Sequence, residues 1–343
     1  MTSRSKNIIY SLVLFTSVLS VWLYRKNQSP DPLHIEGKTM GTTYHITYFD
    51  VDGRNFKAQI DSLLLVVNQS INNYDSLSEV SQFNKNTSSF RFKLPYFYPP
   101  LKKSQEVFEA SHGSFDPTVM PLVNAWGFGA GKVLNLDSAR VDSLKAFVGF
   151  EKILLTADSV SKLNSKTQID FGGIGQGYGA DVITGFLQSK GITNMLVELG
   201  GEGVALGVNL QTGKPWEVGI LDPDSDYVNQ FFKATVRLKN KSFTTSGNYF
   251  NYREINGKKY SHTIDPQTGF PVQRELLSAS VFAKDAITAD AWATALMVMG
   301  HKKAIELLKN YPELDAFLIY TNQDGKKETY ATDGIASLLT IKP

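Results

Sequence analysis

Residues 169–181 read Ile-Asp-Phe-Gly-Gly-Ile-Gly-Gln-Gly-Tyr-Gly-Ala-Asp, with five glycines inside eight positions. The alternating segment Gln168-Ile169-Asp170-Phe171 before the glycines predicts a short strand, and residues 178–190 after them predict a helix that Gly191 ends. Glycine lets a backbone approach a ligand closely, and the first turn of a helix offers free N–H groups to a phosphate. The segment therefore predicts either a phosphate-binding turn or a tight turn packed under another backbone. Its spacing fits neither the dinucleotide fingerprint nor the P-loop.

Strand-like and helix-like patterns lie on both sides of this segment, without strict alternation. Strands are expected at 40–48, 195–199, 204–206, 216–220, 232–238, 242–245, 259–264, 277–282 and 316–320, and helices at 56–72, 101–112, 288–299 and 302–310. This order predicts an α+β fold of mixed sheets with packed helices. We expect one catalytic domain over residues 33–343, a length that can bury a sizeable core.

The first 32 residues predict a membrane-targeting segment followed by a linker. Arg4 and Lys6 precede an apolar run from Ile8 to Tyr24, which two further basic residues close. The run is about long enough to cross a bilayer as a helix, which favours an uncleaved signal anchor. A cleaved signal peptide is the alternative. We expect a bacterial inner-membrane protein whose catalytic domain faces the periplasm.

Composition excludes several classes of site and partner. The chain has no cysteine, so disulfides, thiolate nucleophiles, cysteine-ligated metals and a lipoprotein anchor are ruled out. Its formal net charge is +2, with 35 basic and 33 acidic residues and no basic stripe. Nucleic acid is therefore not an expected partner.

Two further segments carry side chains suited to chemistry. Asp290 and Thr294 lie four residues apart in a predicted helix and share a face, where a carboxylate and a hydroxyl suit a hard cation such as Mg²⁺. An acidic residue stabilised by the helix dipole is the alternative reading. His262 follows a predicted strand and precedes an Asp-Pro-x-x-Gly turn, where it serves either as a general base or as a structural residue.

Taken together and in order, these segments resemble the ApbE-type FAD:protein FMN transferase family. The resemblance rests on Met-Gly-Thr at 40–42, Asn-Tyr-Asp-Ser at 73–76, Phe-Asp-Pro at 115–117, Trp-Gly-Phe-Gly at 126–129, the glycine segment after Asp170, Glu-Leu-Gly-Gly at 198–201, Thr-Ser-Gly-Asn-Tyr at 245–249, Ser-His-Thr-Ile-Asp-Pro at 261–266 and Ala-Asp-Ala-Trp-Ala-Thr-Ala at 289–295. It implies a fold like that of the family and Mg²⁺-dependent transfer of the FMN half of FAD to a threonine or serine of another protein, with release of AMP. The implied acceptors are flavin-carrying subunits of membrane redox complexes.

The resemblance also implies roles for individual residues. The positions that match FAD contacts are Met40, Tyr74, Ser114, Phe115, Asp116, Asp170, Gln176 and His262. Gly173 matches a position that offers its carbonyl to Mg²⁺, and Asp290 and Thr294 match the side-chain ligands. His262 matches the catalytic histidine, and Asp285 is a second candidate.

One departure from the family pattern concerns charge. Members often carry a lysine where this chain has Gln176, which can donate a hydrogen bond but adds no positive charge. Two alternative functions therefore stay open: a Mg²⁺-dependent FAD pyrophosphatase that gives FMN and AMP, and a flavin-binding protein without catalysis.

Overall fold

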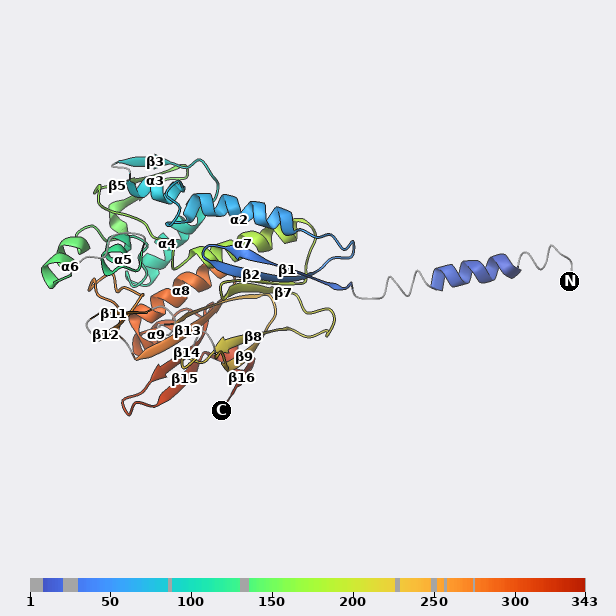
Figure 1. Cartoon of the computed structure of the whole chain (residues 1–343). Coiled ribbons are helices and arrows are strands. Elements are labelled where there is room, and N and C mark those ends of the chain that lie inside the picture. Colours follow the sequence, from blue (N-terminus) through green and yellow to red (C-terminus); the bar gives the residue numbers. More distant parts are fainter. Residues whose placement is uncertain are drawn as a thin grey trace.

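A central antiparallel sheet organises the part of the chain that the computed structural model describes, namely residues 9–20, 30–85, 88–129, 136–225, 229–247, 252–255, 258–273 and 275–342 (Figure 1). Eight strands follow the order β1-β2-β6-β7-β10-β13-β14-β15, and each neighbouring pair is antiparallel. They are β1 (Pro32–Thr39), β2 (Thr42–Phe49), β6 (Met195–Leu199), β7 (Glu202–Leu206), β10 (Lys241–Gly247), β13 (Leu276–Ala283), β14 (Asp315–Thr321) and β15 (Lys327–Ala331).

Smaller sheets and the helices pack around this sheet. A three-stranded sheet joins β16 (Leu339–Ile341), β9 (Phe232–Leu238) and β8 (Trp216–Leu221), another joins β3 (Ser89–Arg91), β5 (Ser159–Lys162) and β4 (Ile153–Leu155), and β11 (Tyr252–Ile255) pairs with β12 (Lys258–Ser261). Besides a helix over residues 9–20, the described helices are α2 (Lys57–Ile71), α3 (Glu79–Lys85), α4 (Tyr98–Ala110), α5 (Met120–Trp126), α6 (Ser138–Lys145), α7 (Gly175–Ser189), α8 (Ala286–Met299), α9 (His301–Leu308) and α10 (Asp333–Ala336), with one 3₁₀ turn, η1 (Phe150–Lys152). Mixed sheets with packed helices confirm the predicted α+β fold.

The two faces of the central sheet are buried by different partners. Side chains alternate along a strand, so neighbouring residues of β13 enter different cores. Val281 packs in the core that contains α8, whereas Phe282 packs with Trp216 and Val236 of the small sheet. Helices α7 and α8 thus cover one face, and the β8–β9–β16 sheet covers the other (Figure 1).

An aromatic cluster anchors the glycine-rich segment to the outer helices. Phe97, the N-cap residue of α4, stacks edge-on against Phe83 and against Phe171, with ring centroids 6.3 and 5.5 Å apart. Phe171 is 2% exposed and directly precedes the glycines. Burial of rings of this size stabilises the fold by about 1.5–3 kcal/mol each, so the start of the turn is held firmly.

The strand predicted over 168–171 is wrong, although the patterns for α2 and α8 are confirmed. Gln168 makes only one isolated bridge, to Val119. Side-chain amides replace the strand ladder, since Asn84 and Asn73 both donate to the carbonyl of Ile169, at 2.8 and 2.7 Å. The chain then turns through the glycines, and α7 begins at Gly175 rather than near 178.

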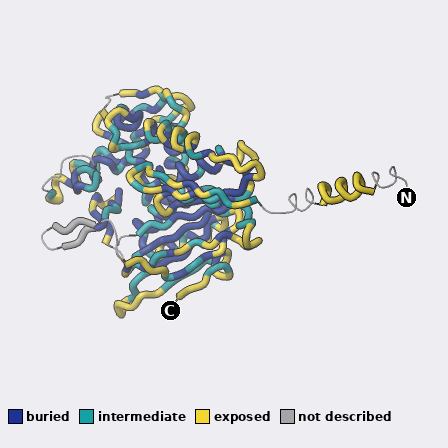
Figure 2. Tube along the Cα trace, turned by 45° about the vertical axis from the view of Figure 1, so that its right-hand side comes forward, coloured by how far each residue is buried: buried dark blue, intermediate teal, exposed yellow. Residues whose placement is uncertain are grey.

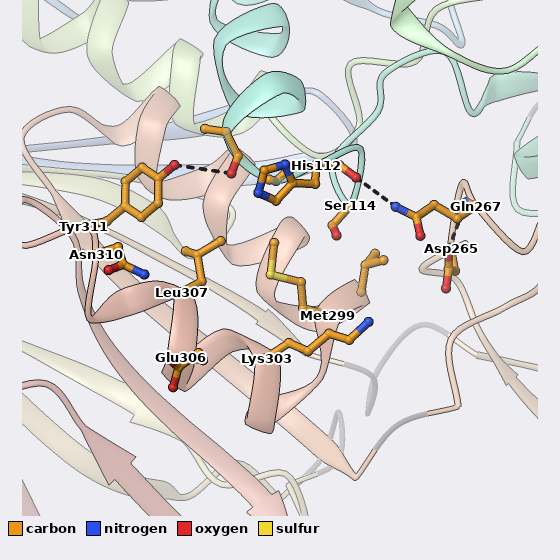
Figure 3. Close-up of a pocket in the computed structure, with 13 residues that line it drawn as sticks. His112, Ser114, Asp265, Gln267, Met299, Lys303, Glu306, Leu307, Asn310 and Tyr311 are labelled. Carbon is orange, nitrogen blue, oxygen red and sulfur yellow. Dashed lines mark hydrogen bonds between the residues drawn. The ribbon is translucent and has the colours of Figure 1, made fainter.

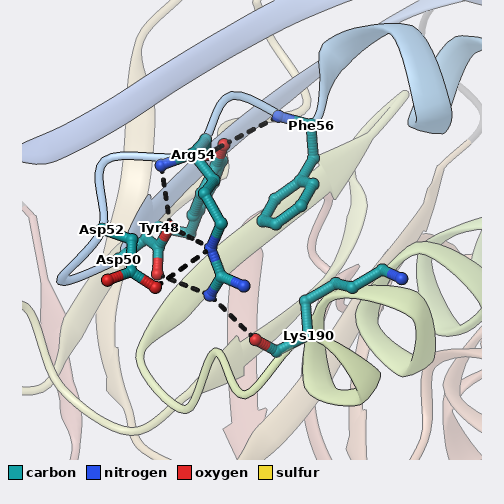
Figure 4. A network of polar contacts seen from close by, with 6 residues as sticks. All are labelled: Tyr48, Asp50, Asp52, Arg54, Phe56 and Lys190. Atoms are coloured by element: carbon teal, nitrogen blue, oxygen red, sulfur yellow. Dashed lines mark hydrogen bonds and ion pairs between the residues drawn. The ribbon is translucent and has the colours of Figure 1, made fainter.

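The connection between β2 and α2 is fixed by a local ion pair (Figure 4). Arg54 donates from Nε and Nη2 to the carboxylate of Asp50, each at 2.8 Å, and from Nη2 to the carbonyl of Lys190 at 3.0 Å. These hydrogen bonds lower the pKa of Asp50 to about 2. The same guanidinium therefore ties the β2–α2 turn to the end of α7.

Residues 9–20 form a helix whose side chains are all exposed (Figure 2). Its large apolar residues include Leu12, Leu14 and Phe15, which are 62–67% exposed. Within the described ranges, no helix is both long and apolar enough to cross a membrane. The predicted run from Ile8 to Tyr24 extends outside the described residues at both ends, and the anchor stays a prediction.

Candidate functional site

The candidate site is built on the contact between α7 and α8, which run antiparallel on one face of the sheet. Every fourth residue along α7 lies against every fourth residue along α8. A Cβ added at Gly177 would lie 2.7 Å from Cβ of Asp290, and the peptide N–H of Ala286 donates to Asp181 at 2.8 Å. Such close approach needs small residues, which explains Gly177 in α7 and Ala286 opposite it in α8.

The same spacing brings the predicted metal ligands together. A Cβ at Gly173 would lie 2.9 Å from Oγ1 of Thr294, so this hydroxyl stands directly over the glycine turn. Asp290 is 5% exposed and accepts a hydrogen bond from the N–H of Gly177 at 2.9 Å. Burial raises the pKa of Asp290 to about 7, the Gly177 N–H opposes this shift, and the charge of Asp181 adds to it.

The chemistry of these groups fits Mg²⁺. A carboxylate, a hydroxyl and a peptide carbonyl are hard oxygen donors, and one carboxylate leaves coordination positions for water and substrate phosphates. Among the described residues there is no group of three or more His, Cys, Asp or Glu side chains that could hold a metal. A cation here would therefore depend on Gly173, Asp290, Thr294 and a phosphate-bearing ligand together.

Two aspartates at the start of α8 satisfy its free N–H groups. Asp285 is the N-cap, and its carboxylate accepts from the N–H of Thr288 at 3.0 Å. Asp181 of α7 accepts from the N–H groups of Ala286 and Ile287, each at 2.8 Å. Burial raises the pKa of Asp181 to about 7 despite these bonds. Asp285 thus has a structural role, while its catalytic role stays a prediction.

The turn between β1 and β2 lies against the first turns of α7. Met40 has a positive φ of 48°, and its side chain reaches within 3.2 Å of a Cβ position at Gly179. Gln176 projects toward the β6–β7 turn, where its Nε2 lies 2.9 Å from a Cβ position at Gly200. The predicted FAD contacts Met40 and Gln176 are therefore both at the N-terminal end of α7.

The segment after α4 packs on the glycine turn from another side. Phe115 is buried, with Cε2 at 3.4 Å from a Cβ position at Gly173. Asp116 accepts from the N–H and the hydroxyl of Thr118, at 2.8 and 2.6 Å. Burial nevertheless raises the pKa of Asp116 to about 6. Phe115 therefore forms part of the wall of the turn, and the FAD contacts of Phe115 and Asp116 stay predictions.

Two more predicted FAD contacts lie beside the turn. Asp170 accepts from the N–H of Gly172 at 2.8 Å, and burial raises its pKa. Tyr74 is 73% exposed, and its hydroxyl donates to the carbonyl of Phe128 at 3.2 Å. An aromatic ring held open to solvent in this way is free to stack on a planar ligand.

His262 follows β12 directly and is half-buried. The loop after it is tied back onto neighbouring helices, since Trp126 Nε1 donates to the carbonyl of Gly269 at 2.9 Å and Gln267 Nε2 donates to the carbonyl of His112 at 2.8 Å. These bonds hold the His262 loop beside the segment that contains Ser114. Residues 248 and 249 of the Thr-Ser-Gly-Asn-Tyr motif lie outside the described residues.

A cavity of about 470 Å³ opens between this loop, the end of α4 and α9 (Figure 3). Ser114, Asp265, Met299 and Lys303 line it among others. It includes one predicted FAD contact, Ser114, but not Asp290 or the glycine turn. The cavity is therefore distinct from the α7–α8 contact.

Sequence reasoning missed two buried acids near the predicted ligands. Asp181 ends the quoted glycine segment but has no sequence signal for its cross-helix capping, because that role depends on how α7 and α8 pack. Glu202 starts β7 and is 7% exposed. Burial raises the pKa of Glu202 well above its usual range, and the charge of Asp290 adds to this.

Comparison with known proteins identifies relatives that cover most of the chain. The model of the ApbE family matches residues 40–318. FAD:protein FMN transferase of Vibrio cholerae is 35% identical over 90% of this chain and 93% of its own length. The protein of the same name from Haemophilus influenzae is 33% identical over 93% of this chain and 95% of its own length.

Solved structures agree with these sequences. The flavin transferase ApbE from Vibrio cholerae, crystallised as a histidine-to-glycine mutant, superposes with a TM-score of 0.80 at 33% identity, covering 90% of this chain and 99% of that one. The apo form of the flavinyl transferase ApbE from Pseudomonas stutzeri gives a TM-score of 0.79 at 29% identity, covering 91% and 98%. With a family model that spans residues 40–318 and relatives 33–35% identical over most of its length, this chain belongs to the ApbE family.

Proposed function

We propose that this protein is an enzyme that transfers the FMN half of FAD to a threonine or serine hydroxyl of an acceptor flavoprotein and releases AMP. Membership of the ApbE family and the names of the relatives support the reaction. The observation that carries the proposal is the α7–α8 contact, which joins the Gly173 turn to Thr294 and the N–H of Gly177 to Asp290. This contact assembles oxygen donors beside a helix N-terminus, where a pyrophosphate is stabilised.

The transfer exchanges the phosphoanhydride bond of FAD for a phosphoester bond to the acceptor. The acceptor hydroxyl oxygen attacks the phosphorus on the FMN side of the pyrophosphate, and the bond from that phosphorus to the AMP phosphate breaks. AMP leaves with the bridging oxygen, and the hydroxyl proton passes to a base on the enzyme. The product is FMN joined to the acceptor through a phosphodiester.

Different residues of this chain serve FAD binding and proton transfer. Tyr74 offers a ring for a planar part of FAD, and Gln176 offers its amide to the pyrophosphate without charge. His262 is the proposed base for the hydroxyl proton, held in place by its tethered loop. Asp285 is a weaker candidate, because its carboxylate already accepts from the N–H of Thr288.

Mg²⁺ is the proposed cofactor, held by the carbonyl of Gly173 and by the side chains of Asp290 and Thr294. Bound there, it would neutralise the charge that grows on the pyrophosphate as AMP departs. Because Gln176 brings no positive charge, dependence on the cation should be strong.

The proposal is tested by incubating the protein with FAD, Mg²⁺ and a candidate acceptor subunit. A mass increase of one FMN on the acceptor, with one AMP released per transfer, is the expected result. His262→Ala should lower the rate by about two orders of magnitude or more. Fast AMP release without acceptor would instead favour the pyrophosphatase, and unchanged FAD turnover in His262→Ala would favour a non-catalytic flavin-binding protein.

We also propose that the N-terminal segment anchors the catalytic domain to the bacterial inner membrane, facing the periplasm. The exposed apolar side chains of residues 9–20 support this, because they bury nothing against the fold. Membrane-bound redox complexes would then present their acceptor subunits on the same side. Deleting residues 1–29 should move the protein from the membrane fraction to the soluble fraction, and continued sedimentation with membranes would refute the anchor.

A further inference from the structure

Three buried side-chain oxygens have no hydrogen-bond partner among the described residues: Glu202 Oε2, Thr244 Oγ1 and Ser278 Oγ. Buried polar atoms are almost always paired, because losing water without gaining a partner costs free energy. An unpaired carboxylate is the most costly of these. Glu202 Oε2 therefore marks a place where a bound water, ion or ligand is expected.

Two of these oxygens lie side by side on the helix-covered face of the sheet. Strand β7 pairs with β10 so that Gly203 is opposite Phe243, and the next step of this register places Glu202 opposite Thr244. Val204 points to the same face as Glu202 and packs in one core with Ala180 of α7 and Ala286 of α8. Glu202 and Thr244 thus face the two helices that carry the predicted metal site.

The neighbourhood of Glu202 is acidic and already contains Asp290. Both carboxylates are more than nine-tenths buried, and neither forms an ion pair with any described residue. The amide of Gln176 lies close by, since its Nε2 and Glu202 Oε2 are 2.9 and 3.1 Å from the same Cβ position at Gly200, but it does not hydrogen-bond that oxygen. Asp290 accepts a hydrogen bond from the N–H of Gly177, but Glu202 Oε2 and the Thr244 hydroxyl have no partner among the described residues, so a bound cation with its water would complete this cluster.

We propose that Glu202 and Thr244 form the sheet-side wall of the cation site whose helix-side ligand is Asp290. Their oxygens hold the water shell of the divalent cation on the side away from the pyrophosphate. Glu202 is then a positioning residue that supplies the negative charge, and Thr244 is a second hydrogen-bonding contact. The inference rests on the proposed metal site but adds residues from β7 and β10 to it.

Metal affinity measured without turnover tests this inference. Full-length protein in detergent is titrated with Mn²⁺ in the presence of ADP, which supplies a pyrophosphate but no FMN, and free Mn²⁺ is followed by electron paramagnetic resonance. The variants are Glu202→Gln, Thr244→Val, Asp290→Asn and a matched control, Glu198→Gln. Glu198 lies on the adjacent strand β6 but pairs with His45, at 2.9 Å.

Glu202→Gln should weaken Mn²⁺ binding about tenfold or more, and Thr244→Val about threefold, as expected for groups that support a metal's ligands. Glu198→Gln should bind like the wild type. The metal-free Glu202→Gln variant should unfold at the same temperature or higher, because a neutral amide replaces an unpaired carboxylate. If Glu202→Gln does not fold, Thr244→Val decides the inference by the same threefold criterion.

Wild-type affinity in Glu202→Gln, together with lost binding in Asp290→Asn, would overturn the inference and leave an ordered water as the partner of Glu202. Wild-type affinity for Mn²⁺ in Asp290→Asn would refute the proposed metal site itself, and this inference with it. The two failures are therefore distinguishable in one set of titrations.

Discussion

Substituting Gly177 by alanine tests the contact on which the site is built. The new Cβ would lie 2.7 Å from Cβ of Asp290 and 2.8 Å from the carbonyl carbon of Ala286, and closer still to the oxygen of that carbonyl. Normal contacts between such atoms are about 3.5–4.0 Å, so the helices must separate by roughly 1 Å. The obstacle is largely backbone, which cannot rotate away as a flexible side chain can.

The magnitude follows from two opposing terms. Overpacking a buried contact costs about 1–3 kcal/mol, and the upper part of that range applies to a backbone obstacle. Alanine in place of glycine inside a helix stabilises that helix by about 1 kcal/mol. We therefore expect Gly177→Ala to lower the free energy of unfolding by about 1–2 kcal/mol. Moving α8 should also weaken Mg²⁺ binding, because Asp290 is displaced from the N–H of Gly177.

Gly185 supplies the matched control in the same helix. A Cβ at Gly185 would meet no atom within 4 Å, so Gly185→Ala should gain the helical term alone and stabilise the protein by up to about 1 kcal/mol. Urea unfolding of both variants, followed by circular dichroism, gives the comparison. Gly177→Ala as stable as Gly185→Ala would refute the close packing of α7 on α8.

Two further predictions concern single carboxylates. The pKa of Asp116, about 6, lies above its unfolded value of about 3.9, so the folded state holds the extra proton and stability falls as pH rises from 4 to 6. Asp116→Asn stays neutral and should be more stable than the wild type by about 1–3 kcal/mol at pH 7 but not at pH 4, and parallel pH profiles of unfolding would contradict this. Asp285→Ser keeps an oxygen that can cap α8, so full FMN transfer activity is expected if capping is its whole role, whereas a drop of about a hundredfold would identify it as the base.

The local sequence pattern predicted those elements whose structure depends mainly on the residues within them. The apolar spacing of α2, with Ile60, Leu64 and Val67 buried on one face, needs no distant partner to be read. The strand predicted before the glycine turn failed, because Asn73 and Asn84, some ninety residues earlier in the chain, satisfy the backbone of Ile169. The starts of α7 and α8 were placed about three and two residues late, partly because Asp290 accepts from the N–H of Gly177 and Asp181 accepts from the first N–H groups of α8, contacts that sequence does not show.

The glycine-rich segment by itself determined that a backbone must come close to something at residues 172–179. Sequence could not decide between a ligand and another backbone, and the structure shows that packing accounts for part of it: Gly177 fits against α8 and Gly179 against Met40. Likewise, the four-residue spacing fixed that Asp290 and Thr294 share a helix face, because helical geometry is local.

Only the tertiary structure decided which groups of other elements lie against the face of α8 that carries Asp290 and Thr294. The antiparallel pairing of α7 and α8 joins Thr294 to the Gly173 turn, Asp290 to Gly177 and Asp181 to the start of α8, through contacts between residues more than one hundred positions apart. The pairing of β7 with β10 likewise brings Glu202 to Thr244. Sequence spacing reports neighbours along one element, whereas the charge balance of a buried site depends on every element that packs against it.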